Sequence, residues 1–134
     1  MGETRTLRPV KSFEDLEVWQ KSRALTLRIY EIANHFPKDE VYGITSQIKR
    51  AALSVPANIA EGFGRYHFLD KAKFYLNARG SLYELKSHLL IATELRFLKQ
   101  SDAADLLQAI DQLALQLNNL INATRKLKRN ETGD

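Results

Sequence analysis

Apolar residues in this chain recur at steps of three and four through four long segments, and this spacing constrains the fold more than any other feature. Such spacing places the apolar side chains on one face of an α-helix. The four segments are residues 13–36, 40–63, 67–98 and 102–129. Four amphipathic helices with short connections bury their apolar faces most simply against one another. The sequence therefore predicts an all-α fold, an antiparallel up-down four-helix bundle.

The length of 134 residues suits one such domain with a single core. We expect residues 1–11 to form a flexible basic arm, residues 12–129 the bundle and residues 130–134 a frayed end. Only six Gly and three Pro occur, which disfavours a β fold with many tight turns. The chain has no Cys, no apolar leader and no apolar run long enough to span a membrane. We therefore expect a cytoplasmic protein without a membrane partner.

Local signals set the predicted helix ends. Ser12 and Asp15 resemble a capping box at the first helix, and Pro37 ends it. Gly62 and Gly64 end the second helix, and Ser101 or Asp102 caps the fourth.

Two further residues break the regular pattern inside the predicted helices. Pro56 lies within the second helix, where it frees the carbonyl of Ala52 and predicts a Pro-kinked helix. Asn58 or Ser54 is the expected local partner for the rearranged backbone. Gly80 lies in the third helix beside Ala78 and Ser81, and this cluster predicts a close helix crossing.

A polar stripe runs along the second helix beside its apolar face. It consists of Gln47, Arg50, Ser54, Asn58 and Glu61, with Arg65 following. One interpretation is a solvated face. The other is a partly buried polar network with Arg50 paired to Glu61, because Ser and Asn are mediocre helix formers on a solvated face.

Apolar residues are also left over outside the predicted core stripes. Several together indicate a subunit interface rather than scattered surface residues. The candidate interface residues are Leu53, Ala57, Ala60, Leu76, Tyr83 and Leu115.

Basic residues concentrate between residues 49 and 99, where nine Lys and Arg face four acids. Aromatic residues alternate with the cations in the first half of this segment, a combination that suits single-stranded nucleic acid. The alternative is that the rings pack in the core and the cations are solvated. The candidate nucleic-acid contacts are Lys49, Arg50, Arg65, Lys71, Lys73 and Arg79.

The sequence offers no catalytic constellation, so we expect no enzyme, no cofactor and no small-molecule substrate. Glu84 and His88 lie one helical turn apart and could form half a metal site. A metal site in a bundle needs matching Glu and His residues on further helices, and these are lacking. We therefore predict no metal.

Three blocks resemble the 23S rRNA intervening-sequence proteins, also called the S23 or four-helix-bundle family. The first block is residues 13–20 (FEDLEVWQ), with Tyr30 and residues 36–37. The second block is residues 40–48 (EVYGITSQI), with residues 50–51 and 54–62 (SVPANIAEG). The third block is residues 80–85 (GSLYEL). The resemblance implies a four-helix bundle that assembles as a homopentameric ring. It also implies a bacterial gene found in insertions within 23S rRNA genes, and no established enzymatic activity. A related group of bundle proteins serves diversity-generating retroelements and binds nucleic acid and a reverse transcriptase.

The leading hypothesis is a non-enzymatic, ring-forming adaptor that associates with RNA or a ribonucleoprotein or reverse-transcriptase partner through a basic surface. The alternative is a protein-protein interaction scaffold with no nucleic-acid role.

Overall fold

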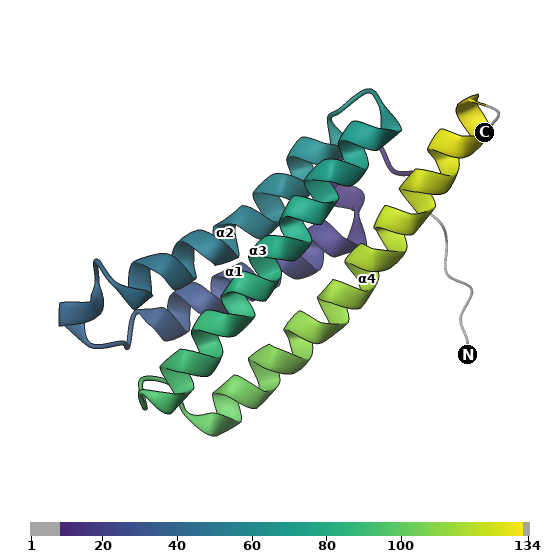
Figure 1. Cartoon of the computed structure of the whole chain (residues 1–134). Coiled ribbons are helices and arrows are strands. Elements are labelled where there is room, and N and C mark those ends of the chain that lie inside the picture. Colours follow the sequence, from purple (N-terminus) through teal and green to yellow (C-terminus); the bar gives the residue numbers. More distant parts are fainter. Residues whose placement is uncertain (1–8, 133–134) are drawn as a thin grey trace.

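The computed structural model describes residues 9–132, with side chains as far as residue 127. The described chain forms four α-helices and two short 3-10 turns, and it contains no strand. In chain order these elements are η1 (Phe13–Asp15), α1 (Glu17–Ala33), η2 (Lys38–Glu40), α2 (Ile44–Phe63), α3 (Phe68–Glu94) and α4 (Gln100–Thr132). Figure 1 shows the helices as one bundle, which confirms the predicted all-α class.

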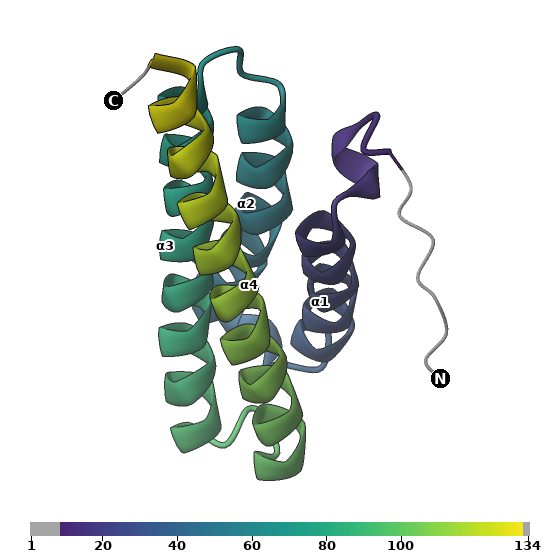
Figure 2. The same ribbon diagram turned by 90° about the vertical axis from the view of Figure 1, so that its right-hand side faces the viewer.

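The helices enclose a single apolar core. Helix α3 packs between α2 and α4, and α1 packs on α2 and more lightly on α4. The α2–α3 connection and the α3–α4 connection lie at opposite ends of the bundle (Figure 2). The most deeply buried large side chains come from all four helices and include Ile29, Ile48, Ile59, Leu82, Leu85, Leu106, Ile110 and Leu117. Within the described residues, no helix is both long enough and apolar enough to cross a membrane.

The first helix is shorter than the sequence pattern predicts. The Asp15 carboxylate accepts hydrogen bonds from the backbone N–H groups of Lys11 and Ser12, which caps the turn η1 rather than a helix. Leu16 is then extended, with φ −74° and ψ 128°, and α1 begins at Glu17. The helix ends at Ala33, three residues before Phe36, whose N–H closes a turn on the Ala33 carbonyl.

The third helix also ends earlier than predicted, at Glu94. The N–H of Phe97 bonds to the carbonyl of Ala92, and the N–H of Arg96 bonds to that of Thr93. This pair of bonds is the Schellman motif. It requires a left-handed residue, and Arg96 adopts it with φ 66° where glycine is usual. The absence of a glycine at this position is why the sequence pattern missed the end.

The fourth helix is longer than predicted at both ends. It begins at Gln100, so Ser101 and Asp102 lie in its first turn rather than at the cap. It continues to Thr132, past residue 129. Residues 1–8 of the predicted arm and residues 133–134 of the predicted frayed end lie outside the described part of the chain.

The cluster at Gly80 does lie against α2, since Ala78 is buried and the Ser81 hydroxyl lies 2.8 Å from that of Ser54. Gly80 itself faces away from this contact, because a Cβ added there would meet nothing within 4 Å. The glycine that the helix packing requires is Gly62. A Cβ added at Gly62 would lie 2.8 Å from Tyr75 Cε1 and 3.0 Å from Phe74 Cβ. Gly62 is buried inside α2, and its role is to admit α3 rather than to end the helix.

Helix α2 is continuous through Pro56, and a kink there stays a prediction. The carbonyl of Ala52, four residues before the proline, cannot receive the usual backbone N–H. The Thr26 hydroxyl of α1 lies 3.1 Å from this oxygen and 2.8 Å from the Ser22 carbonyl, and its one proton is shared between them. The partner of the freed carbonyl is therefore Thr26, and not Asn58 or Ser54 as the local sequence suggested.

Candidate nucleic-acid interface

The polar stripe of α2 lies along its seam with α3, and its first half is exposed. Arg50 Nη2 donates to Gln47 Oε1 at 2.7 Å and to Glu84 Oε2 of α3 at 2.8 Å. Glu84 also lies 3.3 Å from His88 Nε2. The predicted pairing of Arg50 with Glu61 is wrong, because Glu61 pairs with Arg65 one turn further along at 3.0 Å. Arg50 is thus ion-paired across the α2–α3 seam, although its side chain is 60% exposed.

Ser54 and Asn58, in the middle of the stripe, are partly buried. The hydroxyls of Ser54 and Ser81 lie 2.8 Å apart across the seam. Asn58 Nδ2 donates to the Ser54 carbonyl at 2.8 Å and to its hydroxyl at 3.0 Å. The network interpretation therefore holds for Ser54 and Asn58, while Gln47, Arg50 and Glu61 are exposed.

The structure disperses the six candidate phosphate contacts over several faces. Lys49 points toward α1, where Nζ lies 3.2 Å from Asn34 Oδ1 and 5.1 Å from the centre of the Tyr30 ring. Arg79 points toward α4 and donates to Asn118 Oδ1 at 2.7 Å. Together with Arg50, these residues stabilise helix pairs and do not form one surface.

The other three cations lie at the end of the bundle that carries the α2–α3 turn. The Arg65 guanidinium lies 4.5 Å from the centre of the Phe74 ring and pairs with Glu61. Lys73 is exposed and makes no ion pair with any described residue. Figure 1 shows this turn, and the last turns of α4 reach the same end of the bundle.

Lys71 is the least available of these three cations. Its ammonium donates to the carbonyl of Phe63, the last residue of α2, at 2.6 Å. It also lies 5.3 Å from the centre of the Phe63 ring. Burial lowers the pKa of Lys71 below its usual value. A cation at this point satisfies an orphan carbonyl and complements the negative end of the α2 dipole, so its first role is to cap the helix.

Exposed residues that sequence analysis did not select complete this surface. Tyr66 is 85% exposed, and its ring meets that of His67 edge-on at 5.0 Å. Arg125 and Lys126 in the last turns of α4 are exposed as well. The available signal was a run of aromatic residues directly after Gly64, where a helix end forces side chains into solvent. We call Arg65, Tyr66, His67, Lys73, Arg125 and Lys126 the turn-end surface.

Carboxylates also lie at this end of the bundle. Its carboxylates are Glu61, which Arg65 neutralises, and Asp70 in the first turn of α3. The acids Glu14 and Asp15 belong to η1, which lies on the α1 side of this end (Figure 2). The cations of this surface come from three places: Arg65 from the α2–α3 connection, Lys73 from α3, and Arg125 and Lys126 from α4.

The candidate subunit-interface residues form two separate patches. Leu53 and Ala57 are exposed on α2, with the half-buried Ala60 beside them. Tyr83 and Leu115 are exposed over the α3–α4 seam at the same level, because Arg79–Asn118 and Lys86–Asp111 bonds bracket them on both helices. Leu76 is half-buried and packs on the core. Helices α2 and α4 do not contact each other, so the patches lie on different faces.

The described side chains offer no group of three potential metal ligands. Glu84 and His88 do contact each other, but Arg50 occupies the same carboxylate oxygen.

A family model for the 23S rRNA-intervening sequence protein matches residues 14–119, which is most of the chain. The chain belongs to this family. A search of curated proteins finds no match. Among solved structures, the fold matches a protein of unknown function from the S23 ribosomal protein family of Bacteroides thetaiotaomicron. The TM-score is 0.71 at 19% identity, over 78% of this chain and 97% of the other.

The family match covers only part of the turn-end surface. Arg65, Tyr66 and Lys73 lie within the matched residues, whereas Arg125 and Lys126 lie beyond residue 119. Both interface patches fall within the match.

Proposed function

We propose that this protein is a non-enzymatic adaptor that binds RNA through the turn-end surface and presents several copies of it in a ring. The observation that carries the proposal is the exposed Tyr66 ring at the end of the bundle that also carries Lys73, Lys126 and the ion-paired Arg65 (Figure 1). The family name refers to 23S rRNA intervening sequences and supports an RNA partner. A ribonucleoprotein or a reverse-transcriptase complex would present the same RNA chemistry.

The chemistry of the turn-end surface suits an RNA strand with unpaired bases. An exposed aromatic ring stacks on a base, and a stacked base contributes about 1–3 kcal/mol. Lys73 and Lys126 contact phosphates without first breaking an ion pair, because neither is paired within the described structure. The Arg65 guanidinium carbon lies 4.5 Å from the centre of the Phe74 ring, and a guanidinium can also stack on a base.

Assembly into a ring brings together several copies of a surface that binds RNA weakly on its own. Each subunit carries two different apolar patches, one on α2 and one over the α3–α4 seam. A ring requires such a pair, since a head-to-tail interface joins one patch to a different patch on the next subunit. A homopentamer then offers one long RNA several turn-end surfaces, and avidity raises the overall affinity without new contacts.

The test is RNA binding over a salt series with an unstructured single-stranded RNA, and with particle mass read on the same sample. The variant Lys73→Glu/Lys126→Glu removes two free cations of the turn-end surface. The matched control is Lys38→Glu/Lys99→Glu, which makes the same charge change at the opposite end of the bundle. A further variant, Tyr66→Ala, removes the exposed ring without changing charge.

We expect wild-type affinity to fall steeply with salt, and the turn-end variant to flatten the slope by about 1.4 if two phosphate contacts are lost. The control should keep the wild-type slope. Tyr66→Ala should weaken binding with the slope unchanged. Equal losses in both charge variants would contradict a local site, and no binding at low salt would contradict an RNA role for the protein alone.

The alternative function is a protein-protein interaction scaffold, and the exposed apolar patches are the observation that favours it. In that case the patches bind another protein rather than a second copy of this chain. A monomeric wild type without RNA affinity supports this alternative, whereas a homo-oligomer that binds RNA supports the adaptor.

A further inference from the structure

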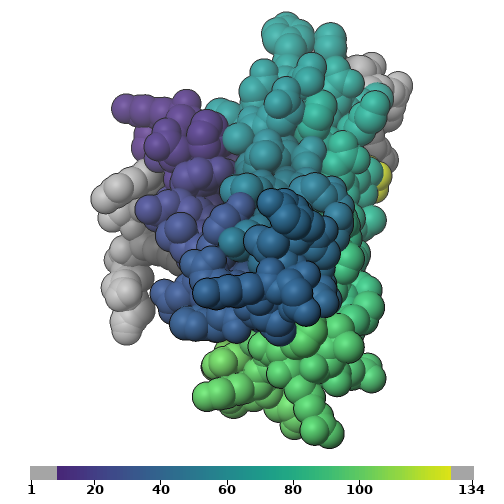
Figure 3. Space-filling view, turned by 90° about the vertical axis from the view of Figure 1, so that its left-hand side faces the viewer, coloured from purple at the N-terminus to yellow at the C-terminus, as the bar shows by residue number. Residues whose placement is uncertain are grey.

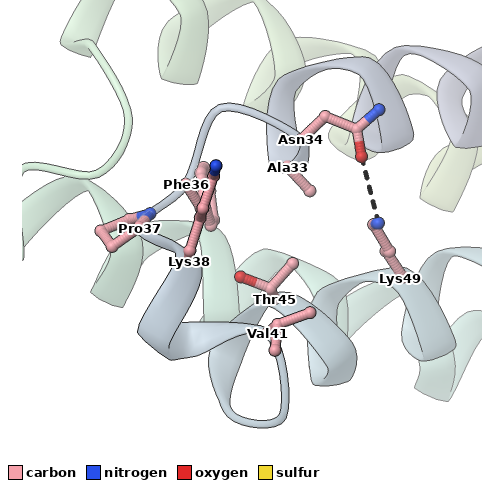
Figure 4. A pocket seen from close by; sticks show the side chains of 8 residues that line it. All are labelled: Ala33, Asn34, Phe36, Pro37, Lys38, Val41, Thr45 and Lys49. Carbon is pink, nitrogen blue, oxygen red and sulfur yellow. Dashed lines mark hydrogen bonds between the residues drawn. The ribbon is translucent and has the colours of Figure 1, made fainter.

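A cavity of about 320 Å³ opens where the end of α1 faces the start of α2, at the end of the bundle opposite the turn-end surface. Ala33, Phe36, Pro37 and Val41 supply apolar walls, and Lys38, Asn34, Thr45 and Lys49 supply polar groups (Figure 4). This volume lies at the small end of the range for ligand pockets, about 300–1,000 Å³. Its size fits a small molecule rather than a peptide.

The Thr45 hydroxyl is a buried polar group with no partner. The residue is 5% exposed, and its Oγ1 makes no hydrogen bond within the described structure. Figure 4 shows this oxygen pointing toward Phe36 and Lys38, into the cavity. An unpaired buried hydroxyl costs about 1–3 kcal/mol, so a group that bonds to it on binding recovers that cost.

The electrostatics of the cavity favour an anion. Lys38 and Lys49 both line it, and Lys49 reaches across to Asn34. Thr45 lies in the first turn of α2, which holds no acidic residue. The first N–H of α2 to find an acceptor is that of Gln47, so the three preceding amides have none among the described residues. The positive end of α2 therefore lies beside the cavity, where the Glu40 carboxylate offsets part of it: Glu40 Oε1 would lie 2.9 Å from a Cβ added at the cap residue Gly43.

The negative end of α1 lies here as well, but its last turn is already satisfied. Asn34, His35 and Phe36 donate their backbone N–H groups to Tyr30, Ile32 and Ala33. The residues that line the cavity thus include two lysines and no carboxylate, and the nearby Glu40 of η2 is not among them.

We propose that this cavity binds a small carboxylate with a short apolar body. The carboxylate oxygens accept hydrogen bonds from Thr45 Oγ1 and the lysine ammonium groups, and the body packs on Phe36, Pro37 and Val41. This site is independent of the turn-end surface and of the RNA proposal. It adds a ligand where the sequence alone predicted no small molecule.

The test uses phenylacetate as probe and phenylacetamide as its uncharged counterpart, with amide chemical shifts followed by NMR on deuterated full-length protein. We expect phenylacetate to shift the amides of Asn34, Val41 and Thr45 saturably, and phenylacetamide to have little effect. Lys49→Met should weaken phenylacetate binding by about tenfold or more, as expected for loss of a charge-assisted hydrogen bond. Thr45→Val should weaken it as well.

The matched controls are Lys99→Met, which removes a cation outside the cavity, and Thr124→Val, which removes a buried hydroxyl from α4. Both should keep wild-type affinity for phenylacetate. The proposal is overturned by the absence of saturable shifts at the three amides, by equal binding of phenylacetamide, or by unchanged affinity in Lys49→Met. A neighbouring subunit that fills the cavity would produce the first of these outcomes.

Discussion

Gly62 and Gly80 lie on adjoining helices but have opposite surroundings. Gly62 touches α3, where an added Cβ would lie 2.8 Å from Tyr75 Cε1. Gly80 has open space around it, and its backbone is helical. Only Gly62 is therefore required by packing, and Gly80 weakens α3 without a steric reason.

We predict that Gly80→Ala raises the free energy of unfolding by about 0.5–1 kcal/mol, because alanine is the better helix former. Gly62→Ala should lower it by about 1–3 kcal/mol, because the methyl group overpacks the α2–α3 contact. Urea denaturation of both variants beside the wild type measures the two changes. A destabilised Gly80→Ala protein would place a packing partner at Gly80 after all, for example in a neighbouring subunit.

Tyr75 should make the free energy of unfolding depend on pH, and the direction of the change can be predicted. Its side chain is buried in the core, and burial raises its pKa to about 12. The unfolded chain releases the phenolic proton near pH 10, while the native state keeps it until about pH 12. Folding stability from this group is fully present below pH 10 and is lost as the pH rises toward 12.

The variant Tyr75→Phe lacks this proton, so its stability should fall less steeply than that of the wild type above pH 10. The difference in slope should not exceed about 1.4 kcal/mol per pH unit. Urea denaturation at pH 8 and pH 11 measures it, and other titrating groups, Lys71 included, cancel between the two proteins. Parallel stability curves would mean that Tyr75 ionises as readily in the native state as in the unfolded chain.

At the scale of the element, Pro56 and Thr26 form a pair across two helices. Proline at position 56 leaves the Ala52 carbonyl without its helical partner, and the Thr26 hydroxyl of α1 supplies a substitute. A buried carbonyl without a partner costs about 1–3 kcal/mol. The proline is thus tolerated inside α2 because α1 packs on it at this point.

We predict that Thr26→Val destabilises the protein by about 1–3 kcal/mol when Pro56 is present. In the Pro56→Ala background residue 56 regains an N–H for the Ala52 carbonyl, and the same change should cost less. A double-mutant cycle by urea denaturation isolates this coupling. Equal costs in the two backgrounds would show that Thr26 contributes through its bond to Ser22 alone.

Apolar spacing was enough to predict the four helices, because burial of one face decides whether a long amphipathic segment is helical. The ends of the helices were harder to predict. Leu16 and Arg96 interrupt helices through backbone bonds that form only once the chain is folded, and neither residue is a usual helix breaker. Proline and glycine positions were read correctly as special, but the contacts of Gly62, Gly80 and Pro56 depend on a second helix.

The candidate site was less predictable than the fold. Composition located the basic segment, but it could not separate Lys73, which is free, from Arg50 and Arg79, which bond across helix seams. The cations of α4 join the turn-end surface through the folding of the chain and not through sequence proximity (Figure 1). Spacing within one helix carries no information on which neighbouring helix a side chain will meet.

At the scale of the whole molecule, the two ends of the bundle differ in character. One end carries the exposed Tyr66 and the free cations, and the other carries the apolar cavity with Thr45. Figure 3 looks onto the segment between α1 and α2, which lies at the front of that view. A ring built through the sides of the bundle leaves both ends accessible.

The two apolar patches make a specific prediction about assembly. If α2 of one subunit meets the α3–α4 seam of the next, then Leu53→Glu and Leu115→Glu each damage a different half of the same interface. Either variant alone should fail to form the ring, because every interface contains one buried, unpaired carboxylate. Leu27→Glu, at an exposed leucine of α1, is the matched control and should assemble as the wild type does.

An experiment that mixes the two variants distinguishes head-to-tail assembly from two-fold assembly. The Leu53→Glu subunit keeps an intact α3–α4 patch, and the Leu115→Glu subunit keeps an intact α2 patch, so an equimolar mixture can form one sound interface. We expect a one-to-one heterodimer in sedimentation velocity, and only monomers in each separate sample. A two-fold interface would instead join like patches. Each variant would then form homodimers through its undamaged patch before mixing. The mixture would contain these homodimers and no heterodimer.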